Sequence, residues 1–407
     1  METIKKVAVG QLRPGMFIHD LNCAWMDHPF ATNRFRVRND SQVQEIQSLG
    51  IPEVYIDTGL GLDVADAPTQ GEVDSLIARD MEEIAQIPLN EVRRVALAEE
   101  MTRARKLHAE ANRVVKGMLR DIRLGRQVEM EQVEPLVEQI VDSIFRNQDA
   151  LLPLARLKEY DNYTFQHSVS VCALLASFAR GLGLDRGTIK EVAIGGLLHD
   201  VGKAKVPEDI LNKPAKLTEA EFAKMKSHVV QSILLLQNTP RISQIALDVA
   251  GQHHERYDGS GYPNKLKGTE ITLYGRMGAI VDVYDALTSD RVYHKGMAPT
   301  AALGRLLEWS SFHFDPELVR AYVRAVGIYP TGSLVRLESG RLGVVTEQHE
   351  DKPMQPKVRV IFHAVHQHYL PPEMLDLAWP GSRDRIVGHE EFADWRIDPQ
   401  AWLPQAT

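Results

Sequence analysis

The hydrophobic positions of this 407-residue chain follow two different spacings. Apolar and β-branched residues form short runs near both ends, whereas residues 90 to 324 mostly repeat an apolar position every three or four residues. The first pattern is typical of β-strands and the second of amphipathic helices. We therefore predict a mainly α protein, with an all-helical central domain, a small α+β module before it and a short β-rich tail after it.

Turn residues and changes of pattern divide the chain into four parts. Residues 1–65 form the accessory module, and residues 66–127 combine a linker, in the polar stretch 63–74, with a connecting helix. The helical domain is predicted over residues 128–330 and the β-rich extension over residues 331–407. The individual elements expected are strands at 4–9, 17–19 and 54–57, helices at 41–49, 90–123 and 129–146, and tail strands at 334–337, 343–345 and 358–362.

Composition narrows the class of protein. Hydrophobic residues make up 44% of the chain and charged residues 25%, as in ordinary globular proteins. No run reaches the ~20 apolar residues that span a bilayer, and no signal-peptide core follows Met1. Two cysteines, Cys23 and Cys172, fit a reducing compartment. We therefore expect a cytoplasmic protein, and the net charge of −8 argues against binding to a nucleic-acid polymer or a membrane surface.

Histidines and aspartates lie on the apolar stripes of the predicted helices. Five of the 15 histidines fall between His167 and His254, and His167 is in line with three apolar residues of its helix. Asp200 lies on a similar stripe, and Asp282 shares its helix face with small residues, Gly275, Gly278, Ala286 and Ser289. A buried carboxylate without a partner costs several kcal/mol, and neutral histidines cannot compensate two such charges. One or two divalent cations would satisfy all of these groups, and iron, manganese, nickel and zinc suit this ligand set.

A single histidine on an apolar stripe is more often a hydrogen-bonded core residue, but five such helices in series favour a metal site. The tail contains a second histidine group, His363, His366 and His368, which alternates with apolar residues and has no acidic neighbour. We interpret that group as a solvated strand face.

The order of these residues resembles the HD superfamily of metal-dependent phosphohydrolases, through His167, His199-Asp200 and Asp282. The segment HHERYDGSGYP at 253–263 is similar to the signature of the HD-GYP branch, as are HDVGK at 199–203, LNKP at 211–214 and DALTSDR at 285–291. The resemblance extends over residues 133–330, and residues 1–65 resemble a small domain often found ahead of HD-GYP domains.

The resemblance implies a set of site residues. The implied metal ligands are His167, His199, Asp200, His228, His253, His254 and Asp282, with Asp200 shared by two divalent ions, iron or manganese before nickel or zinc. Asp200 and Lys203 are the implied catalytic residues. Lys203 and Arg291 match positions that contact substrate phosphate, and Gly261, Tyr262 and Pro263 shape the wall of the site. From the residues alone, Lys203 also fits a helix C-terminus, and Arg291 a surface ion pair with Asp290 or Asp285.

One position departs from the pattern of some family members. Where they carry a glutamate that helps to hold a third metal, this chain has Tyr163, so we expect two ions. The implied function is hydrolysis of cyclic di-GMP to pGpG, and onward to GMP in some members, in bacterial signalling. The alternatives are a cyclic-dinucleotide sensor or adaptor without hydrolysis, and an HD phosphohydrolase of another nucleotide such as cyclic GMP-AMP. A protein partner at the GYP loop and a homodimer are left open.

Overall fold

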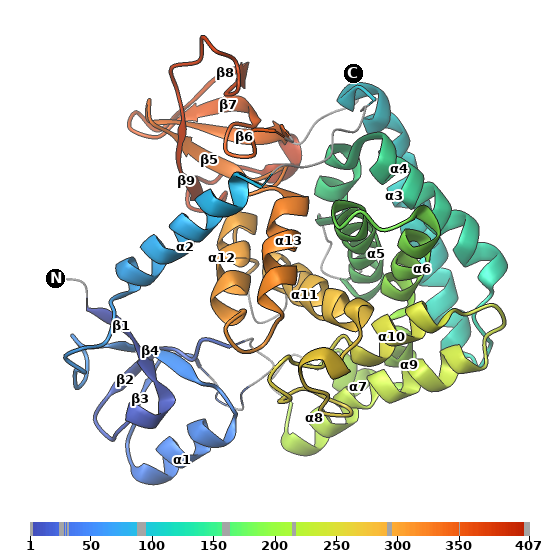
Figure 1. The fold of residues 1–407 in the computed structure, drawn as a ribbon, viewed down its shortest axis with the longest axis horizontal. Helices are drawn as coiled ribbons and strands as arrows, with labels where there is room; N and C mark the ends of the chain where they lie inside the picture. The colour runs from blue at the N-terminus through green and yellow to red at the C-terminus, as the bar shows by residue number, and fades with distance from the viewer. Residues whose placement is uncertain are drawn as a thin grey trace. The chain divides into compact units, whose positions relative to one another are not determined.

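The computed structural model of the protein describes residues 3–23, 28, 30, 32–87, 95–156, 163–213, 217–290, 295–349 and 351–402. The chain divides into two compact units, Met1–Met81 with Asn212–Ala223, and Glu82–Leu211 with Lys224–Thr407. Helices dominate and one small sheet lies towards each end of the chain, so the predicted fold class is confirmed (Figure 1). None of the described helices is long and apolar enough to cross a membrane.

The N-terminal sheet has four strands in the order β1-β4-β2-β3, and the two pairs made by β4 are antiparallel. Its elements are β1 (Ile4–Ala8), β2 (Phe17–Asp20), β3 (Phe35–Arg36), α1 (Asp40–Ser48) and β4 (Glu53–Asp57). The Asn39 side chain caps α1 by accepting a hydrogen bond from the backbone nitrogen of Gln42. The three predicted strands and the helix are confirmed to within two residues, whereas the two-residue strand β3 was not predicted.

The polar stretch predicted as a linker is only partly a linker, because helix α2 (Gln70–Ala85) begins inside it. The backbone nitrogen of Thr69 donates to the Glu72 carboxylate at 2.8 Å, and the backbone nitrogen of Glu72 donates to the Thr69 hydroxyl at 3.3 Å. This capping box satisfies backbone groups of the first turn. It therefore starts a helix despite the proline and glycine that had favoured a linker.

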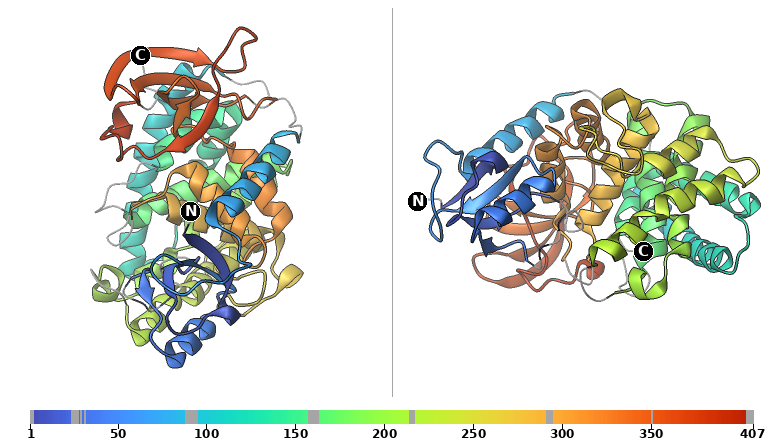
Figure 2. Two further views of the ribbon diagram at one scale, coloured as in Figure 1. Left: turned by 90° about the vertical axis from the view of Figure 1, so that its left-hand side faces the viewer. Right: turned by 90° about the horizontal axis from the view of Figure 1, so that it is seen from below.

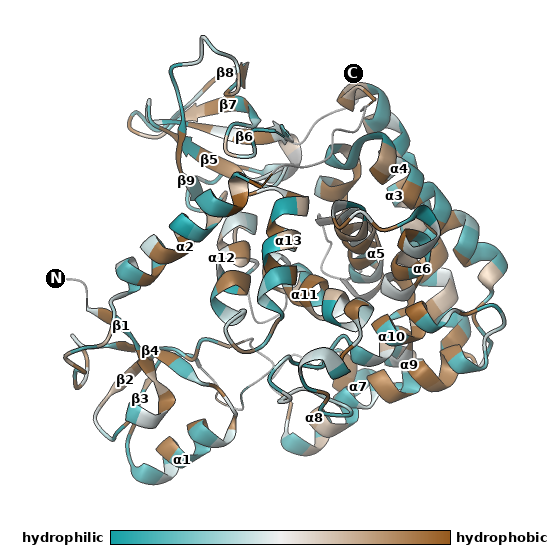
Figure 3. Ribbon diagram, in the orientation of Figure 1, coloured by the Kyte–Doolittle hydropathy of each residue, from teal (hydrophilic) through white to brown (hydrophobic). Residues whose placement is uncertain are grey.

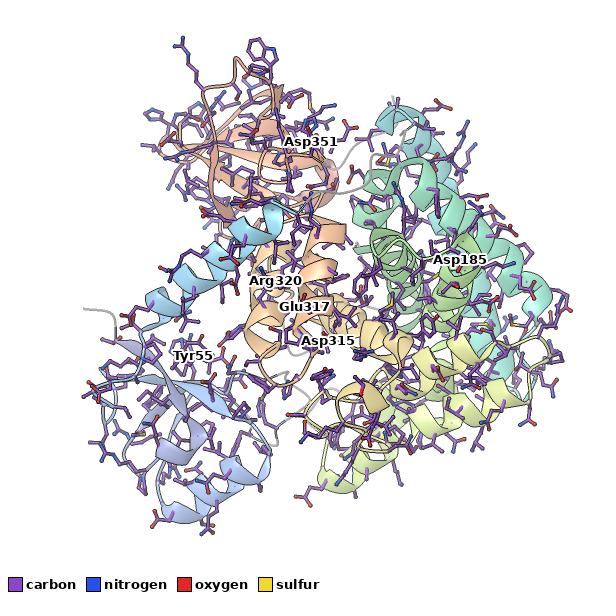
Figure 4. The ribbon with its side chains drawn as sticks, viewed as in Figure 1. Tyr55, Asp185, Asp315, Glu317, Arg320 and Asp351 are labelled. Carbon is purple, nitrogen blue, oxygen red and sulfur yellow. The ribbon has the colours of Figure 1, made fainter. Side chains whose placement is uncertain are left out.

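The central part of the chain is helical, as predicted. Its elements are α3 (Leu97–Arg123), α4 (Met130–Arg156), α5 (Tyr163–Gly181), α6 (Arg186–Leu198), η4 (Val201–Lys205), α7 (Glu208–Leu211), α8 (Glu219–Lys226), α9 (His228–Gln237), α10 (Gln244–Gln252), α11 (Leu273–Thr288), α12 (Pro299–Trp309) and α13 (Pro316–Val326). Side chains cap several helix starts, including Asp185 at α6 and Asp315 at α13, both labelled in Figure 4.

Four of these helices pack in a closed ring. Helix α5 contacts α6 and α11, and α10 contacts the same two helices from the other side (Figure 1). Helix α5 is largely apolar along its length, as its brown colour in Figure 3 shows. A Cβ atom on Gly195 would lie 2.7 Å from Val249 of α10, and one on Gly196 would lie 2.7 Å from Leu175 of α5. These two glycines let α6 lie close to both neighbours.

Two helices differ from the sequence prediction. The helix expected to begin after Thr218 and to carry His228 is broken at Ser227, so that His228 is the first residue of α9. The helix predicted to end near Arg146 continues to Arg156 across Asn147, whose backbone is not helical (φ −166°, ψ 102°). Neither position is a glycine or a proline, the residues that most strongly mark helix ends in a sequence.

Helix α3, predicted as a connecting helix, packs against α4, α5 and η4. The buried Glu100 carboxylate accepts hydrogen bonds from Arg146 at 2.6 and 2.8 Å and from Ser143 at 2.8 Å. At the other end of the helix, Lys205 Nζ donates to the Ile122 carbonyl at 3.1 Å. The helix therefore belongs to the body of the helical domain.

We expect a truncated protein that starts at Val128 to lose cooperative unfolding, whereas one that starts at Glu82 keeps it. The first lacks four large apolar side chains that α3 buries, Met101, Leu107, Val115 and Ile122, and each stabilises the fold by roughly 1.5–3 kcal/mol. Together they match the total stability of a typical domain, about 5–15 kcal/mol. Circular dichroism during thermal unfolding measures the difference. A cooperative transition in the shorter protein would show that α3 is dispensable.

The tail forms a five-stranded antiparallel sheet in the order β8-β7-β6-β5-β9, seen from two further sides in Figure 2. Its strands are β5 (Leu334–Leu337), β6 (Arg341–Glu347), β7 (Lys357–His363), β8 (His368–Asp376) and β9 (Ile386–Glu390). The buried carboxylate of Asp149 in α4 accepts hydrogen bonds from the Thr331 hydroxyl at 2.7 Å and the Gln348 backbone nitrogen at 3.1 Å. The three predicted tail strands are confirmed, and β8 and β9 were not predicted.

Candidate metal centre

The fold brings all seven predicted ligands together at the ring of helices. His167 lies in α5 and Asp282 in α11, while the others stand at helix ends: His199 and Asp200 after α6, His228 at the start of α9, and His253 and His254 after α10. The donor atoms of His167, His199 and Asp282 lie within 4.8 Å of one another. The same holds for His199, Asp200 and His253, and for His228, His253 and His254. Shared members join the three groups into one cluster.

Asp200 lies at the centre of this cluster, and its side chain is only 1% exposed. Its Oδ2 atom is 3.4 Å from His167 Nε2 and 3.3 Å from His199 Nε2. Its Oδ1 atom is 3.3 Å from His228 Nε2 and 3.9 Å from His253 Nε2. The two oxygens of one carboxylate thus face two different pairs of histidines.

Asp282 closes the cluster from the side of α11. Its Oδ1 atom is 3.1 Å from His167 Nε2, and its Oδ2 atom is 3.7 Å from His254 Nδ1. Two carboxylates and five imidazoles therefore surround one buried space.

The ring nitrogens that point away from the centre are held by hydrogen bonds. The Nδ1 atoms of His199, His228 and His253 donate to backbone carbonyls three residues earlier, at 2.7, 2.7 and 2.9 Å. This arrangement places the hydrogen on Nδ1 and leaves each Nε2 with a lone pair that faces the centre of the cluster. His167 differs, because its Nδ1 atom lies 2.6 Å from the carboxylate of Asp285.

Burial and charge set the protonation of the cluster. Burial lowers the pKa of His228 to about 4 and that of His253 to about 3, so both rings are neutral at pH 7, the form that binds metals. Burial acts in the same direction on His167, but the carboxylates of Asp200, Asp282 and Asp285 raise its pKa to about 9.

The two central carboxylates stay ionised. Burial would raise the pKa of Asp200, but Lys203 and His199 hold it well below its usual value. Asp282 behaves in the same way: burial works against ionisation, and His167 and His254 hold its pKa low. Two negative charges therefore persist in a buried cluster, beside the neutral rings of His228 and His253.

The residues fit a divalent cation. Among the described residues, Asp200 Oδ1, His228 Nε2 and His253 Nε2 are buried side-chain atoms without a hydrogen-bond partner. Such atoms are rare in folded proteins, because each costs free energy unless something binds it. All three face the same space, and a cation held between them would satisfy them together. Imidazole and carboxylate are ligands of divalent transition metals.

The predicted substrate-contact residues that the structure describes, Lys203 and the segment 261–263, lie next to the cluster. Lys203 Nζ lies 2.5 Å from Asp200 Oδ2, and the Lys203 side chain is 22% exposed, so it stands at the edge of the cluster. The Tyr262 ring stacks on His254 with centroids 4.7 Å apart. The segment with Gly261 and Pro263 thus lies against the metal ligands. Arg291 lies outside the described residues.

A buried carboxylate that was not predicted shapes this segment. Glu255 accepts hydrogen bonds from the backbone nitrogens of Asn264 at 2.7 Å and Leu266 at 3.0 Å. Gly261 packs against the backbone of Glu255, where a Cβ atom would lie 2.5 Å from its Cα. Asp285 was also missed, although it follows Asp282 by three residues on the buried face of α11 and could have been found by that spacing.

The tail histidines stay apart from this cluster. His363 ends β7 and His368 begins β8, with His366 in the exposed turn between the two strands. The described residues that group as metal ligands do not include them. His366 and His368 are exposed, as a solvated face predicts, whereas His363 is half-buried, and the three residues lie at a hairpin turn rather than along one strand.

Comparison with known proteins agrees with this site. Residues 4–133 match the family model of a domain of unknown function, DUF3391, and residues 144–318 match that of the HD domain. The Pseudomonas aeruginosa protein "Cyclic di-GMP phosphodiesterase PA4108" is 43% identical over 400 residues, which cover 97% of this chain and 94% of that protein. The chain therefore belongs to the family of HD-domain proteins that includes PA4108. The HD domain and the His and Asp groups together indicate a divalent-metal site.

Two further proteins are similar to this chain, one over a shorter stretch and the other at a lower sequence identity. The Vibrio cholerae protein "3'3'-cGAMP-specific phosphodiesterase 1" is 44% identical over 136 residues, 33% of this chain and 31% of that protein. The solved structure of Bd1817 from Bdellovibrio bacteriovorus, described as a HDG"Y"P protein, covers 78% of this chain and 98% of that one, with a TM-score of 0.47 and 16% identity.

Proposed function

We propose that the protein is a metal-dependent phosphodiesterase that hydrolyses cyclic di-GMP to pGpG in bacterial signalling. The observation that carries this proposal is the position of Asp200, whose two oxygens face different histidine pairs in a buried cluster. The similarity to PA4108 over nearly the whole chain supports cyclic di-GMP as the substrate. Tyr163 replaces the glutamate of some family members, which favours pGpG over GMP as the product.

The seven clustered residues would hold two divalent ions, iron or manganese before nickel or zinc. His167, His199 and Asp282 belong to one side of the site, His228, His253 and His254 to the other, and Asp200 to both. When bound, such a pair supplies an acidified water and screens the charge of a phosphodiester. The neutral rings of His228 and His253 need not lose a proton before they bind a metal ion.

The chain's own groups then handle the substrate. Lys203 lies beside Asp200 and neutralises a non-bridging phosphate oxygen. An ammonium group forms a charge-assisted hydrogen bond with such an oxygen, which is stronger than a hydrogen bond between neutral groups. The Tyr262 ring forms a flat wall next to His254 against which a base or ribose rests. Arg291 has the planar fork that suits phosphate and remains a proposed contact from the sequence.

A cyclic GMP-AMP phosphodiesterase is the second candidate, favoured by the similarity of 136 residues to the Vibrio cholerae protein of that name. Parallel hydrolysis assays on the two cyclic dinucleotides separate the candidates. A sensor without hydrolysis is the third reading, and it would bind cyclic dinucleotide without needing stoichiometric metal.

The remaining parts of the chain have proposed roles outside the chemistry. Residues 1–65 form a regulatory module, and residues 331–407 form an extension. Of the segment 66–127, predicted to join the module to a catalytic domain at 128–330, helix α3 belongs to the body of the catalytic domain. The GYP loop and a homodimer are candidate sites of protein contact. A cytoplasmic location stays a prediction from the sequence.

The test of the proposal is a metal analysis of anaerobically purified protein together with a hydrolysis assay. We expect about two metal ions per chain, as in other two-metal phosphodiester sites, and hydrolysis of cyclic di-GMP that a chelator stops. Three ions per chain would contradict the binuclear site. Full hydrolysis after complete removal of metal would contradict the function itself.

A further inference from the structure

His167 is the one histidine of the cluster whose outer nitrogen is held by a charged group. His199, His228 and His253 each donate Nδ1–H to a neutral backbone carbonyl. His167 Nδ1 instead lies 2.6 Å from Asp285 Oδ2, and the two residues are 118 positions apart in the chain. We propose that Asp285 is a positioning residue that orients His167 and strengthens it as a metal ligand, an inference that rests on the proposed metal-dependent function.

The Asp285 carboxylate is itself held through both of its oxygens. Its side chain is fully buried, and its Oδ1 atom accepts a hydrogen bond from the Ser170 hydroxyl. Ser170 and His167 are three residues apart on α5, so one face of that helix supplies both donors. Neither the carboxylate nor the imidazole can turn without breaking a buried hydrogen bond. His167 Nε2 is thereby held towards Asp282 Oδ1 at 3.1 Å and Asp200 Oδ2 at 3.4 Å.

Orientation alone does not need a carboxylate, because carbonyls orient the other three rings. What Asp285 adds is a negative charge. Two divalent cations bring four positive charges to the pocket, while Asp200 and Asp282 bring two negative ones. Asp285 supplies a third negative charge, next to the Nδ1 atom of His167. An imidazole that is hydrogen-bonded to a carboxylate is a stronger metal ligand than one that is hydrogen-bonded to a carbonyl.

Replacing Asp285 by asparagine tests the effect of its charge separately from the effect of its shape. Asp285→Asn keeps the size and one acceptor oxygen but removes the charge. Asp149→Asn is the matched control, because Asp149 is also a buried aspartate with two hydrogen-bond donors, Thr331 and the Gln348 backbone. Those donors join α4 to the C-terminal sheet, so the control alters packing without touching a ligand.

The experiment titrates Mn²⁺ alone into metal-free full-length protein against a chromophoric chelator, and records thermal unfolding of the metal-free forms. We expect Asp285→Asn to weaken Mn²⁺ binding about 10–100-fold, the range found when outer partners of metal ligands are removed. Asp149→Asn should lower the unfolding temperature while Mn²⁺ affinity stays within about threefold of the wild type, since no ligand moves.

The outcomes separate this inference from the proposed function. If the wild-type protein binds no Mn²⁺, the proposed function fails. If the wild type binds Mn²⁺ and Asp285→Asn binds it equally well, only the role of Asp285 is overturned. Should Asp285→Asn fail to fold, Ser170→Ala removes one of the two bonds from α5 to the carboxylate. We expect it to weaken Mn²⁺ binding at least severalfold, and unchanged affinity in that variant would overturn the role of Asp285.

Discussion

Replacing Asp200 by alanine should abolish hydrolysis of cyclic di-GMP and deplete the protein of metal. The carboxylate is buried, and its two oxygens face two separate pairs of histidines. Its removal takes away the one group placed to serve both halves of the cluster, together with a negative charge that two cations need. Elemental analysis of the folded variant, beside an assay of pGpG release, measures both effects.

Lys203→Ala gives the contrasting result. The lysine lies at the edge of the cluster and is not placed as a metal ligand, so metal content should stay near normal. Loss of one charge-assisted phosphate contact should reduce catalysis by about 1.5–3 kcal/mol, or roughly 10- to 150-fold. Asp200→Ala should therefore lose more activity, and it alone should lose metal.

His363→Ala is the control for both variants. His363 lies at the end of β7 in the tail sheet and outside the described metal-ligand groups, so metal content and activity should match the wild type. A correctly folded Asp200→Ala protein with full metal and measurable hydrolysis would contradict the proposed site. Loss of metal in His363→Ala would instead place the site in the tail.

The helices could be predicted where buried apolar residues recur every three or four positions, which is the spacing of one helix face. The apolar stripes of α5 and α11 include His167 and Asp282, and those of α6 and α10 end directly before His199-Asp200 and His253-His254. This is why a metal cluster could be inferred before any contact was known. Elements without such a stripe were missed. Strand β8 is largely exposed and contains two consecutive prolines, so it shows no alternation of buried and exposed positions. The Ser227 backbone is itself in the helical region, so the boundary between α8 and α9 leaves no mark in the sequence.

The outer residues of the site could not be predicted in the same way. Glu255 accepts hydrogen bonds from backbone nitrogens, which do not depend on residue type. The side chains of Asn264 and Leu266 therefore give no indication of the contact. The spacing from Asp282 could have placed Asp285 on the buried face of α11, but its contact with His167, 118 positions away, leaves no record in one sequence. The position of Lys203 was easier to predict, because a spacing of three residues along a helical turn already places it beside Asp200.

Gly202→Ala should disturb the metal site as severely as the loss of a ligand, although Gly202 touches no metal ligand with a side chain. Gly202 lies in η4, between Asp200 and Lys203, where η4 packs against the start of α9. Its backbone nitrogen donates to the Ser232 hydroxyl at 2.9 Å, and that hydroxyl donates to the His199 carbonyl at 2.8 Å. An added Cβ atom would collide with the His228 carbonyl oxygen and would lie 2.5 Å from the Ser232 backbone nitrogen.

Those neighbours are backbone atoms, which cannot turn aside as a flexible side chain would. The variant must therefore move η4 away from α9, and this carries Asp200 and Lys203 away from His228. Overpacking of this kind costs about 1–3 kcal/mol of stability. A displacement near 1 Å at a catalytic site can cost about 100-fold in rate, so we expect both metal content and hydrolysis to fall.

Gly117→Ala is the matched control, because nothing lies within 4 Å of a Cβ atom added at this position in the middle of α3. There the exchange should leave metal and activity unchanged and stabilise the protein by about 0.5–1 kcal/mol, the gain expected from replacing a helical glycine. Thermal unfolding and elemental analysis of the two variants side by side give the comparison. If Gly202→Ala matched Gly117→Ala in stability and in metal content, η4 could not lie against α9 as closely as the site requires. The placement of Asp200 opposite His228 would then be wrong.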